Sequence, residues 1–186
     1  MLISGFDAFG ALTTNPTEAL VERLASSGTD IQSIILPTSF SRSWPHLRDQ
    51  IISTQATSVV MFGYAASADG LRVERRALNS CRLSSTDNDG NHPTKVISPS
   101  GPSQLYSTVR DSFWQEVNAV GKRVSVSNNA GGYVCNYVYF RALQFAHSLD
   151  RRLPVLFVHT SVFPSDAGRF DQSVAAARAL LKLVRI

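Results

Sequence analysis

The sequence predicts an α/β protein in which helices pack on both faces of a mainly parallel sheet. Short β-rich runs alternate with helical patterns along the whole chain, as in proteins built from crossover connections. One run, residues 58–63, is continuously apolar, which is typical of a central strand covered on both faces. The 186 residues contain no internal repeat and no linker, so one domain spanning residues 1–186 is expected.

The first half of the chain is expected to hold four strands and two helices. The segment TTNPT at 13–17 supplies an N-cap and a proline at the start of the first helix, and the small residues at 26–28 end this helix. The second helix covers residues 44–54, with apolar residues on one side. The predicted strands are 1–6, 31–36, 58–63 and 71–78.

The second half begins with residues 80–103, which are polar and rich in Ser, Asn, Asp, Gly and Pro. This composition predicts a long surface loop, and such loops are usually functional or mobile. The remaining segments are predicted as a helix at 104–119, a strand at 123–127, a helix at 135–149, a strand at 153–159 and a helix at 165–184.

Composition narrows the function classes. The hydrophobic content of 44% and charged content of 17% are ordinary for a globular protein. The net charge of +4 comes from scattered arginines, so no nucleic-acid partner is expected. The chain has no apolar run that could span a bilayer and no charged region typical of a signal peptide, so a cytoplasmic protein without a membrane partner is expected. Its two cysteines are then expected to be reduced, and no Cys/His spacing suggests a metal.

The segment 127–140 carries the strongest chemical signal. A β-rich run ends in a turn with two glycines, and Cys135 follows on the first turn of a predicted helix. The positive end of a helix dipole lowers a thiol pKa, and the free N–H groups of the first turn can bind an oxyanion. Cys135 is therefore a candidate nucleophile, although a buried structural cysteine fits the same pattern.

A nucleophilic cysteine needs a base, normally histidine. His147 lies twelve residues further along the same helix, roughly 18 Å away, which excludes it. His46 is expected at the surface or in packing, and His92 lies in the long loop. His159 ends a predicted strand, where the carboxyl ends of parallel strands form the usual ligand crevice. His159 is the preferred base, with a hydrogen-bonded core histidine as the alternative.

A carboxylate should orient the imidazole. Three of the four glutamates lie on predicted helices, and Glu74 lies among arginines in the segment 71–79. An ion pair with one of those arginines is the simpler explanation for Glu74. Asp69 and Asp166 remain alternatives for the orienting carboxylate.

Four segments, in order along the chain, carry a resemblance to a known family. They are GFDAFG at 5–10 with NPT at 15–17, ERRALN at 74–79 with DNDG at 87–90, AGGYVCN at 130–136, and VH at 158–159. These segments are similar to those of the pyroglutamyl peptidase I (pyrrolidone-carboxylate peptidase) cysteine peptidases, of which the chain resembles a divergent member.

The resemblance implies a three-layer α/β/α sandwich of the phosphorylase/hydrolase-like type with a mixed, mainly parallel sheet. It implies a cysteine-dependent omega-peptidase that removes N-terminal pyroglutamyl residues from blocked peptides by acyl transfer, without metal or cofactor. Cys135 would be the nucleophile, His159 the base and Glu74 the orienting carboxylate. Members of the family often form homo-oligomers.

The expected substrate-binding residues come from the same resemblance and from the turn before the cysteine. They are Phe6, Phe9, Tyr64, Arg82, Gly132 and Val134. Phe9 would enclose the flat lactam ring, the N–H groups near Gly132 to Cys135 would bind the oxyanion, and Arg82 would assist them.

Several recognition positions depart from the family pattern. Tyr64 stands where members usually carry Gln, Ser84 where they carry Arg, and Ser85 at an apolar pocket position. A site that hydrogen-bonds one group discriminates strongly against analogues, so such changes predict altered specificity. Two alternatives therefore remain: a cysteine hydrolase of another small amide or lactam, and a non-catalytic binding module on the same scaffold.

Overall fold

The structure is a computed structural model that describes residues 1–26, 30–121 and 123–185. Its main sheet has six strands in the order β2-β1-β3-β8-β4-β7. Four neighbours, β2, β1, β3 and β8, are parallel, whereas β4 runs antiparallel to β8 and parallel to β7. The strands are β1 (Leu2–Phe6), β2 (Gln32–Leu36), β3 (Val59–Tyr64), β4 (Leu71–Glu74), β7 (Val124–Ser127) and β8 (Val155–Thr160). The predicted α/β fold with a mixed, mainly parallel sheet is confirmed.

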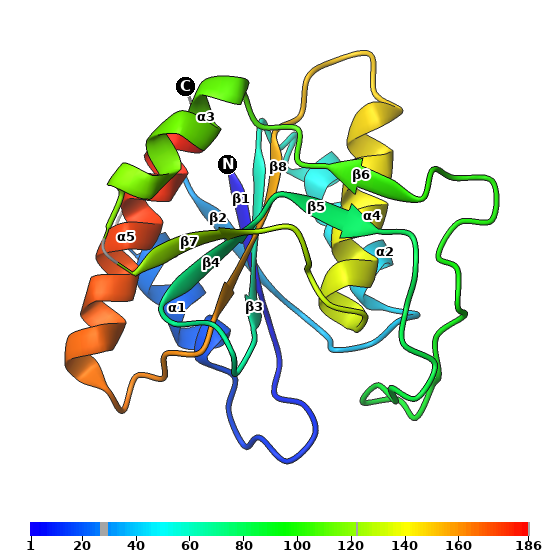
Figure 1. The fold of residues 1–186 in the computed structure, drawn as a ribbon, viewed down its shortest axis with the longest axis horizontal. Coiled ribbons are helices and arrows are strands. Elements are labelled where there is room, and N and C mark those ends of the chain that lie inside the picture. Colours follow the sequence, from blue (N-terminus) through cyan, green and yellow to red (C-terminus); the bar gives the residue numbers. More distant parts are fainter. Residues whose placement is uncertain (27–29, 122, 186) are drawn as a thin grey trace.

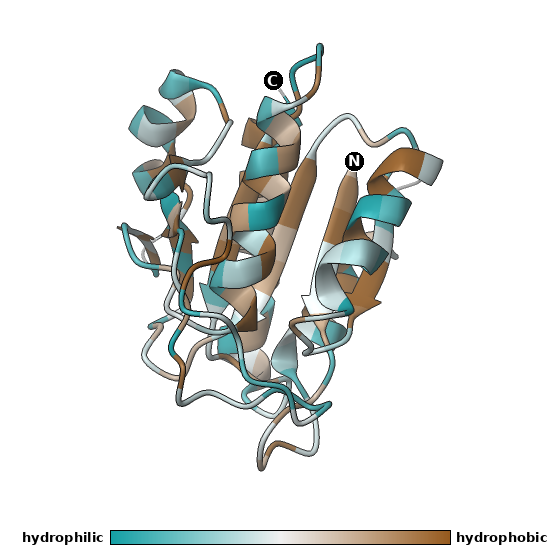
Figure 2. Ribbon diagram, turned by 90° about the vertical axis from the view of Figure 1, so that its right-hand side faces the viewer, coloured by the Kyte–Doolittle hydropathy of each residue, from teal (hydrophilic) through white to brown (hydrophobic). Residues whose placement is uncertain are grey.

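Helices cover both faces of this sheet (Figure 1). Helices α1 (Pro16–Ala25) and α5 (Ala167–Arg185) pack on one face together with the short α3 (Asp111–Glu116) and a 3₁₀ turn at Val117–Ala119. Helices α2 (Ser43–Ser53) and α4 (Val134–His147) pack on the other face. Figure 2 shows the apolar strands of the sheet lying between helices whose outer sides are more polar. Among the helices of the described residues, none is both long enough and apolar enough to span a bilayer.

Strand alternation decides which side chains reach each face. In β3, Val59 and Met61 face the α2/α4 layer, while Val60 and Phe62 face the α1/α5 layer. In β8, Val155 and Phe157 face α2/α4, while Leu156 and Val158 face α1/α5. By the same alternation, position 63 and His159 at the ends of these strands face the α4 side. The residues that end β3 and β8 are therefore presented to the beginning of α4.

Two secondary-structure predictions need correction. The segment 71–78 is not one strand: it breaks at Arg75, and β5 (Arg76–Leu78) pairs with β6 (Gln104–Tyr106) in a separate two-stranded sheet. The predicted helix at 104–119 is wrong at its start, because residues 104–106 form β6 and α3 begins only at Asp111.

Side-chain hydroxyls explain the second error. Ser107 donates its hydroxyl to the carbonyl of Val155, and Thr108 donates to the carbonyl of Leu153, both at 2.6 Å. Such side-chain bonds to a distant backbone compete with helix formation. The hydroxyls hold this segment against the start of β8 instead.

Residues 80–103 contain no helix or strand, as predicted for a long loop. The loop is anchored to the protein at several points. The side chain of Asn79 exchanges hydrogen bonds with the backbone of Ser98, and Cys81 donates its N–H to Lys95. The first helix begins at Pro16 with Asn15 as its N-cap, as predicted. The predicted helix stop at 26–28 lies partly outside the described residues.

Candidate active site

The candidate site lies where the ends of β3 and β8 meet the first turn of α4. The sulfur of Cys135 lies against Gly63, the position next to last in β3. A Cβ placed on Gly63 would be 2.9 Å from Cys135 Sγ and 2.7 Å from Phe157 Cζ. Only a glycine leaves room for the sulfur at this point of the sheet.

The turn before α4 is built by its own polar side chains. The hydroxyl of Ser127 accepts a hydrogen bond from the N–H of Asn129, whose side-chain oxygen accepts one from the N–H of Gly131, both at 3.0 Å. Gly131 has a φ of 86°, a left-handed conformation that favours glycine. This compact turn delivers Cys135 to the first turn of α4, as the sequence predicts.

Asn136, the next residue, fixes the start of α4 to the neighbouring small sheet. Its side chain accepts a hydrogen bond from the N–H of Leu78 at 2.9 Å and donates to the carbonyls of Leu78 and Ser80 at 2.8 and 2.9 Å. The residue is fully buried. Because Asn136 adjoins Cys135, these bonds also restrict where the sulfur can lie.

His159 and Glu74 form a buried pair on adjacent strands. The Nδ1 atom of His159 lies 2.8 Å from Glu74 Oε1, and both side chains are almost entirely buried. The same oxygen also accepts a hydrogen bond from Arg72 Nε at 2.9 Å. With Glu74 ionised, Nδ1 is the donor, so Nε2 is the ring nitrogen left to exchange a proton.

Opposing effects act on the Glu74 carboxyl. Burial alone would raise its pKa, but hydrogen bonds from His159, Ser127 and Arg72, together with the charge of His159, outweigh burial and lower the pKa. The carboxylate is thus held in its ionised form beside the imidazole. Glu74 thus contacts both His159 and an arginine, the two partners that the sequence suggests for it.

Strand register brings the histidine and the cysteine to the same place. The sulfur of Cys135 lies against Gly63, and Gly63 is the register partner of His159 in the parallel β3–β8 pair. Adjacent strands lie about 4.8 Å apart, and both positions face the α4 side. Cys135, His159 and Glu74 therefore converge on the α4 side of the sheet, beside the central strands β3, β8 and β4. The alternatives Asp69 and Asp166 lie elsewhere, paired with arginines at the surface.

The expectation of a lowered thiol pKa is wrong for the protein without substrate. Burial raises the pKa of Cys135 to about 12, and the negative charge of Glu74 adds to this rise. The desolvation of the thiolate outweighs the favourable position at a helix start. At neutral pH the resting sulfur is therefore a protonated thiol, and a base is needed to make it a nucleophile.

Two residues close to the site in sequence, Tyr64 after Gly63 and Tyr133 before Cys135, belong to a cluster of aromatic rings. The ring of Phe9 lies 6.2 Å from that of Tyr64 and 5.7 Å from that of Tyr133, and Tyr64 lies 5.6 Å from Phe163. Tyr133, two residues before Cys135, also contacts Phe40 at 5.6 Å. We call these five partly or fully buried rings, which adjoin the site through Tyr64 and Tyr133, the aromatic wall.

The other predicted substrate-binding residues differ in how they reach the site. Phe6 is only 2% exposed and packs on Phe157, so its side chain belongs to the core. The side chain of Val134 is fully buried as well, which leaves its backbone N–H as the available group. Arg82 donates its backbone N–H to Gly132 at 2.8 Å, and its side chain is exposed.

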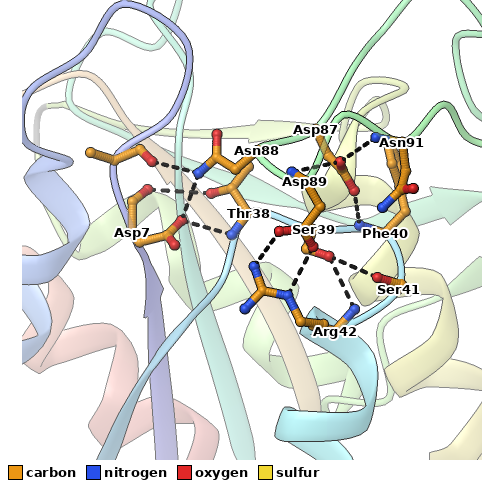
Figure 3. Close-up of polar contacts among 11 residues, drawn as sticks. Asp7, Thr38, Ser39, Phe40, Ser41, Arg42, Asp87, Asn88, Asp89 and Asn91 are labelled. Carbon is orange, nitrogen blue, oxygen red and sulfur yellow. Dashed lines mark hydrogen bonds and ion pairs between the residues drawn. The ribbon is translucent and has the colours of Figure 1, made fainter.

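Polar contacts join three loops that frame this site (Figure 3). Asp7, after β1, accepts a hydrogen bond from the N–H of Thr38 at 2.7 Å. Asn88, in the long loop, donates its side-chain amide to the carbonyl of Ala8 at 2.7 Å and its N–H to the carbonyl of Thr38 at 3.1 Å. The GFDAFG and DNDG segments thus meet across the loop that follows β2.

Asp87 and Asp89 extend this connection. The buried carboxylate of Asp87 accepts from the N–H groups of Phe40, Asp89 and Asn91 at 2.8 to 3.0 Å. Asp89 forms a two-point ion pair with Arg42 at 2.8 and 2.5 Å (Figure 3). These contacts hold Phe40, and through it Tyr133, in the aromatic wall.

Four residues at the site were not identified as functional from the sequence: Gly63, Arg72, Tyr133 and Asn136. The glycine that interrupts an otherwise apolar strand was a usable signal, because such glycines often mark a close approach. The asparagine beside the cysteine was another. Arg72 and Tyr133 depend on strand pairing and loop position, which local patterns do not reveal.

Comparisons with known proteins agree with this geometry. The sequence profile of a family described as pyroglutamyl peptidase matches residues 1–179. A pyrrolidone-carboxylate peptidase of Brevibacillus brevis is 30% identical over 98% of this chain and 87% of its own length, and one of Streptococcus pyogenes is 32% identical over 86% and 76%.

Solved structures are similar over the whole chain. Pyroglutamyl peptidase I from Bacillus amyloliquefaciens has a TM-score of 0.88 at 26% identity, covering 100% of this chain and 94% of that one. The pyrrolidone carboxyl peptidase from Thermococcus litoralis has a TM-score of 0.86 at 25% identity, covering 99% and 92%.

Proposed function

The chain belongs to the pyroglutamyl peptidase family of cysteine peptidases, and from this premise we propose that it removes N-terminal pyroglutamyl residues from peptides. The proposal assigns Cys135 as nucleophile, His159 as general base and Glu74 as the carboxylate that orients the imidazole. The observation that carries it is the buried His159–Glu74 pair, in which His159 is the register partner of Gly63, the glycine against which the sulfur of Cys135 lies.

The reaction begins from a protonated thiol. As Sγ of Cys135 attacks the carbonyl carbon that links the pyroglutamyl group to the next residue, His159 Nε2 takes the thiol proton. Glu74 stabilises the imidazolium that results. Proton transfer during the attack accounts for catalysis by a sulfur whose pKa burial raises to about 12.

The carbonyl oxygen becomes an oxyanion, and we assign its binding to the backbone N–H groups between Gly132 and Cys135. The imidazolium then gives its proton to the leaving amine, and a pyroglutamyl thioester remains on Cys135. Water, activated by His159, attacks the thioester and releases pyroglutamate, which restores the thiol. A free thiol nucleophile requires reducing conditions, so we place the reaction in the cytoplasm.

The aromatic wall supports a flat, small acyl group. Phe9 and Tyr133 offer ring faces to a five-membered lactam, as apolar pocket walls do in small-molecule sites. Tyr64 offers one hydroxyl, as donor or acceptor, where the family usually has an amide with both. Recognition of the lactam by Tyr64 would therefore use fewer hydrogen bonds than in other members.

The test is the release of a fluorogenic amine from its pyroglutamyl amide. The wild type should release it, and Cys135→Ser and His159→Ala should not. The prolyl amide is the matched control, because proline has the same ring without the lactam carbonyl and should be cleaved far more slowly. No release by the wild type above the Cys135→Ser rate refutes the pyroglutamyl substrate.

The altered positions Tyr64, Ser84 and Ser85 favour a second candidate, a cysteine hydrolase of another small amide or lactam. The same panel should then include other N-terminal lactam and acyl amides. The raised pKa of the Cys135 thiol favours a third candidate, a non-catalytic binding module. Alkylation of Cys135 that depends on pH and on His159 would exclude the third candidate.

A further inference from the structure

Arg72 contacts Glu74, one of the proposed catalytic residues, and has no part in the reaction proposed above. Its Nε atom donates to Glu74 Oε1 at 2.9 Å, and His159 Nδ1 lies 2.8 Å from the same oxygen. One carboxylate oxygen, Glu74 Oε1, is thus the hydrogen-bond acceptor for both Arg72 Nε and His159 Nδ1. The Arg72 side chain is 22% exposed, and its Nη1 atom is held by Ser67 at 3.0 Å.

The strand pairing places Arg72 beside the histidine as well. Arg72 and His159 are register partners in the antiparallel β4–β8 pair, and Glu74 is the diagonal neighbour of His159 on the same face. Side chains directly opposite each other across such a pair lie about 5 Å apart at Cβ, and like charges there repel. A protonated imidazole at position 159 therefore meets the fixed positive charge of Arg72.

We propose that Arg72 is a positioning residue that holds Glu74 against His159 and, through its charge, disfavours the imidazolium form of His159 in the resting site. The proposal rests on the proposed function of Cys135 and His159. The Arg72–Glu74 pair is neutral as a unit, so the pull of Glu74 on an imidazolium is reduced.

Few elements contribute other charged or titratable groups that face the His159–Glu74 pair. Besides Arg72 and Glu74 from β4, α4 contributes Cys135 and Tyr139 among the described residues. Tyr139 donates its hydroxyl to the backbone carbonyl of Glu74 at 2.9 Å, and burial raises the pKa of this tyrosine, so it remains neutral. Strand β7 contributes the uncharged hydroxyl of Ser127 beside the carboxyl of Glu74. Arg72 is thus the one permanent cation in this group.

The experiment compares wild type, Arg72→Gln, Arg72→Lys and Arg48→Gln, a matched surface control. The pH dependence of kcat/KM is measured with the pyroglutamyl amide. In parallel, the rate of iodoacetamide labelling is measured against pH at the peptide that contains Cys135, which needs no substrate. Circular dichroism and thermal unfolding establish that each variant is folded.

For Arg72→Gln we expect the acidic limb of both profiles to move up by about one pH unit, because removal of the cation favours the imidazolium. Arg72→Lys keeps the charge but not the Nε bond, so its limb should stay in place while kcat falls by about tenfold. Arg48→Gln should match the wild type in both profiles. A residue that only stabilises the fold would not shift the pH profile in Arg72→Gln while lowering kcat without such a shift in Arg72→Lys.

The inference is overturned if the Arg72→Gln limb is unchanged or moves to lower pH, or if Arg72→Lys shifts the limb. If Arg72→Gln does not fold, Arg72→Lys alone decides, since an unchanged kcat or a moved limb contradicts the proposal. Failure of the proposed function gives a different result: the wild type is inactive on the pyroglutamyl amide, while the labelling profiles still shift. An active wild type with superimposed profiles refutes the role of Arg72 alone.

Discussion

Gly63→Ala tests how the protein places its sulfur. The added Cβ would lie 2.9 Å from Cys135 Sγ and 2.7 and 2.8 Å from two ring atoms of Phe157. Non-bonded carbon contacts are optimal at about 3.5 to 4.0 Å, so Cys135 Sγ or the Phe157 ring must move away by roughly 0.6 to 1 Å. The Phe157 ring has little freedom to move, because it is fully buried and packs on Phe6, Tyr139 and His159.

The sulfur is therefore the atom expected to move, and with it the reaction geometry. A misplacement of about 1 Å can cost about 100-fold in rate, so kcat/KM should fall by roughly that factor. The extra methyl group should also lower the free energy of unfolding by about 1 to 3 kcal/mol, as is usual for overpacking. Cleavage of the pyroglutamyl amide and urea unfolding measure the two effects.

Gly168→Ala is the matched control. Gly168 lies in the first turn of α5, and a Cβ there would meet no atom within 4 Å. Alanine is the better helix former by about 0.5 to 1 kcal/mol, so this variant should be as active as the wild type and slightly more stable. A Gly63→Ala variant with full activity and unchanged stability would refute the placement of the sulfur against β3.

Three further substitutions test the supports of the site. Glu74→Gln should lower kcat by about 1,000-fold or more, because the orienting carboxylate is lost. Since the pKa of Glu74 is lowered in the folded protein, its ionisation stabilises the fold above about pH 4 and this contribution is lost at lower pH, so Glu74→Gln should flatten the acid side of the stability profile. Asn136→Ala removes three hydrogen bonds and leaves the N–H and carbonyl of Leu78 unpaired, which should cost about 3 kcal/mol of unfolding free energy and reduce kcat. Asp87→Ala removes the acceptor of three backbone N–H groups, including that of Phe40, and should raise KM more than it lowers kcat.

Each of these has a clear contrary result. If Glu74→Gln has the same kcat as the exposed control Glu22→Gln, the role given to Glu74 is contradicted. A Glu74→Gln variant whose unfolding free energy falls with acid in parallel with the wild type contradicts it as well. Asn136→Ala with wild-type unfolding in urea contradicts the buried hydrogen bonds. Asp87→Ala that changes kcat and leaves KM unaltered indicates that the loops do not shape substrate binding.

Local patterns predicted most of the fold because the information lies within each element. The apolar run of β3, the Asn15-Pro16 start of α1 and the apolar side of α2 are decided by neighbours in sequence. The partners of β4 are not decided in that way. It follows β3 in the chain but pairs with β7 and β8, so its direction depends on contacts more than 50 residues away.

The site residues likewise differ in whether local sequence patterns identify them. Cys135 and His159 were identified from their places at a helix start and a strand end, which are local features. Glu74 required the resemblance to a family, because an acid among arginines is not specific on its own. The direction of the Cys135 pKa shift was predicted wrongly, since burial of the sulfur depends on Gly63 and the packed sheet rather than on the helix start.

Labelling with a pyroglutamyl chloromethyl ketone tests the central claim most directly. The reagent carries the lactam ring to the site and alkylates a nearby sulfur with loss of chloride. The proposed convergence of Cys135, His159 and Glu74 under an aromatic wall predicts alkylation at Cys135, loss of labelling in His159→Ala, and a much slower reaction with the prolyl analogue. Labelling at Cys81 instead, or equal rates for the two reagents and for the His159→Ala variant, would contradict it.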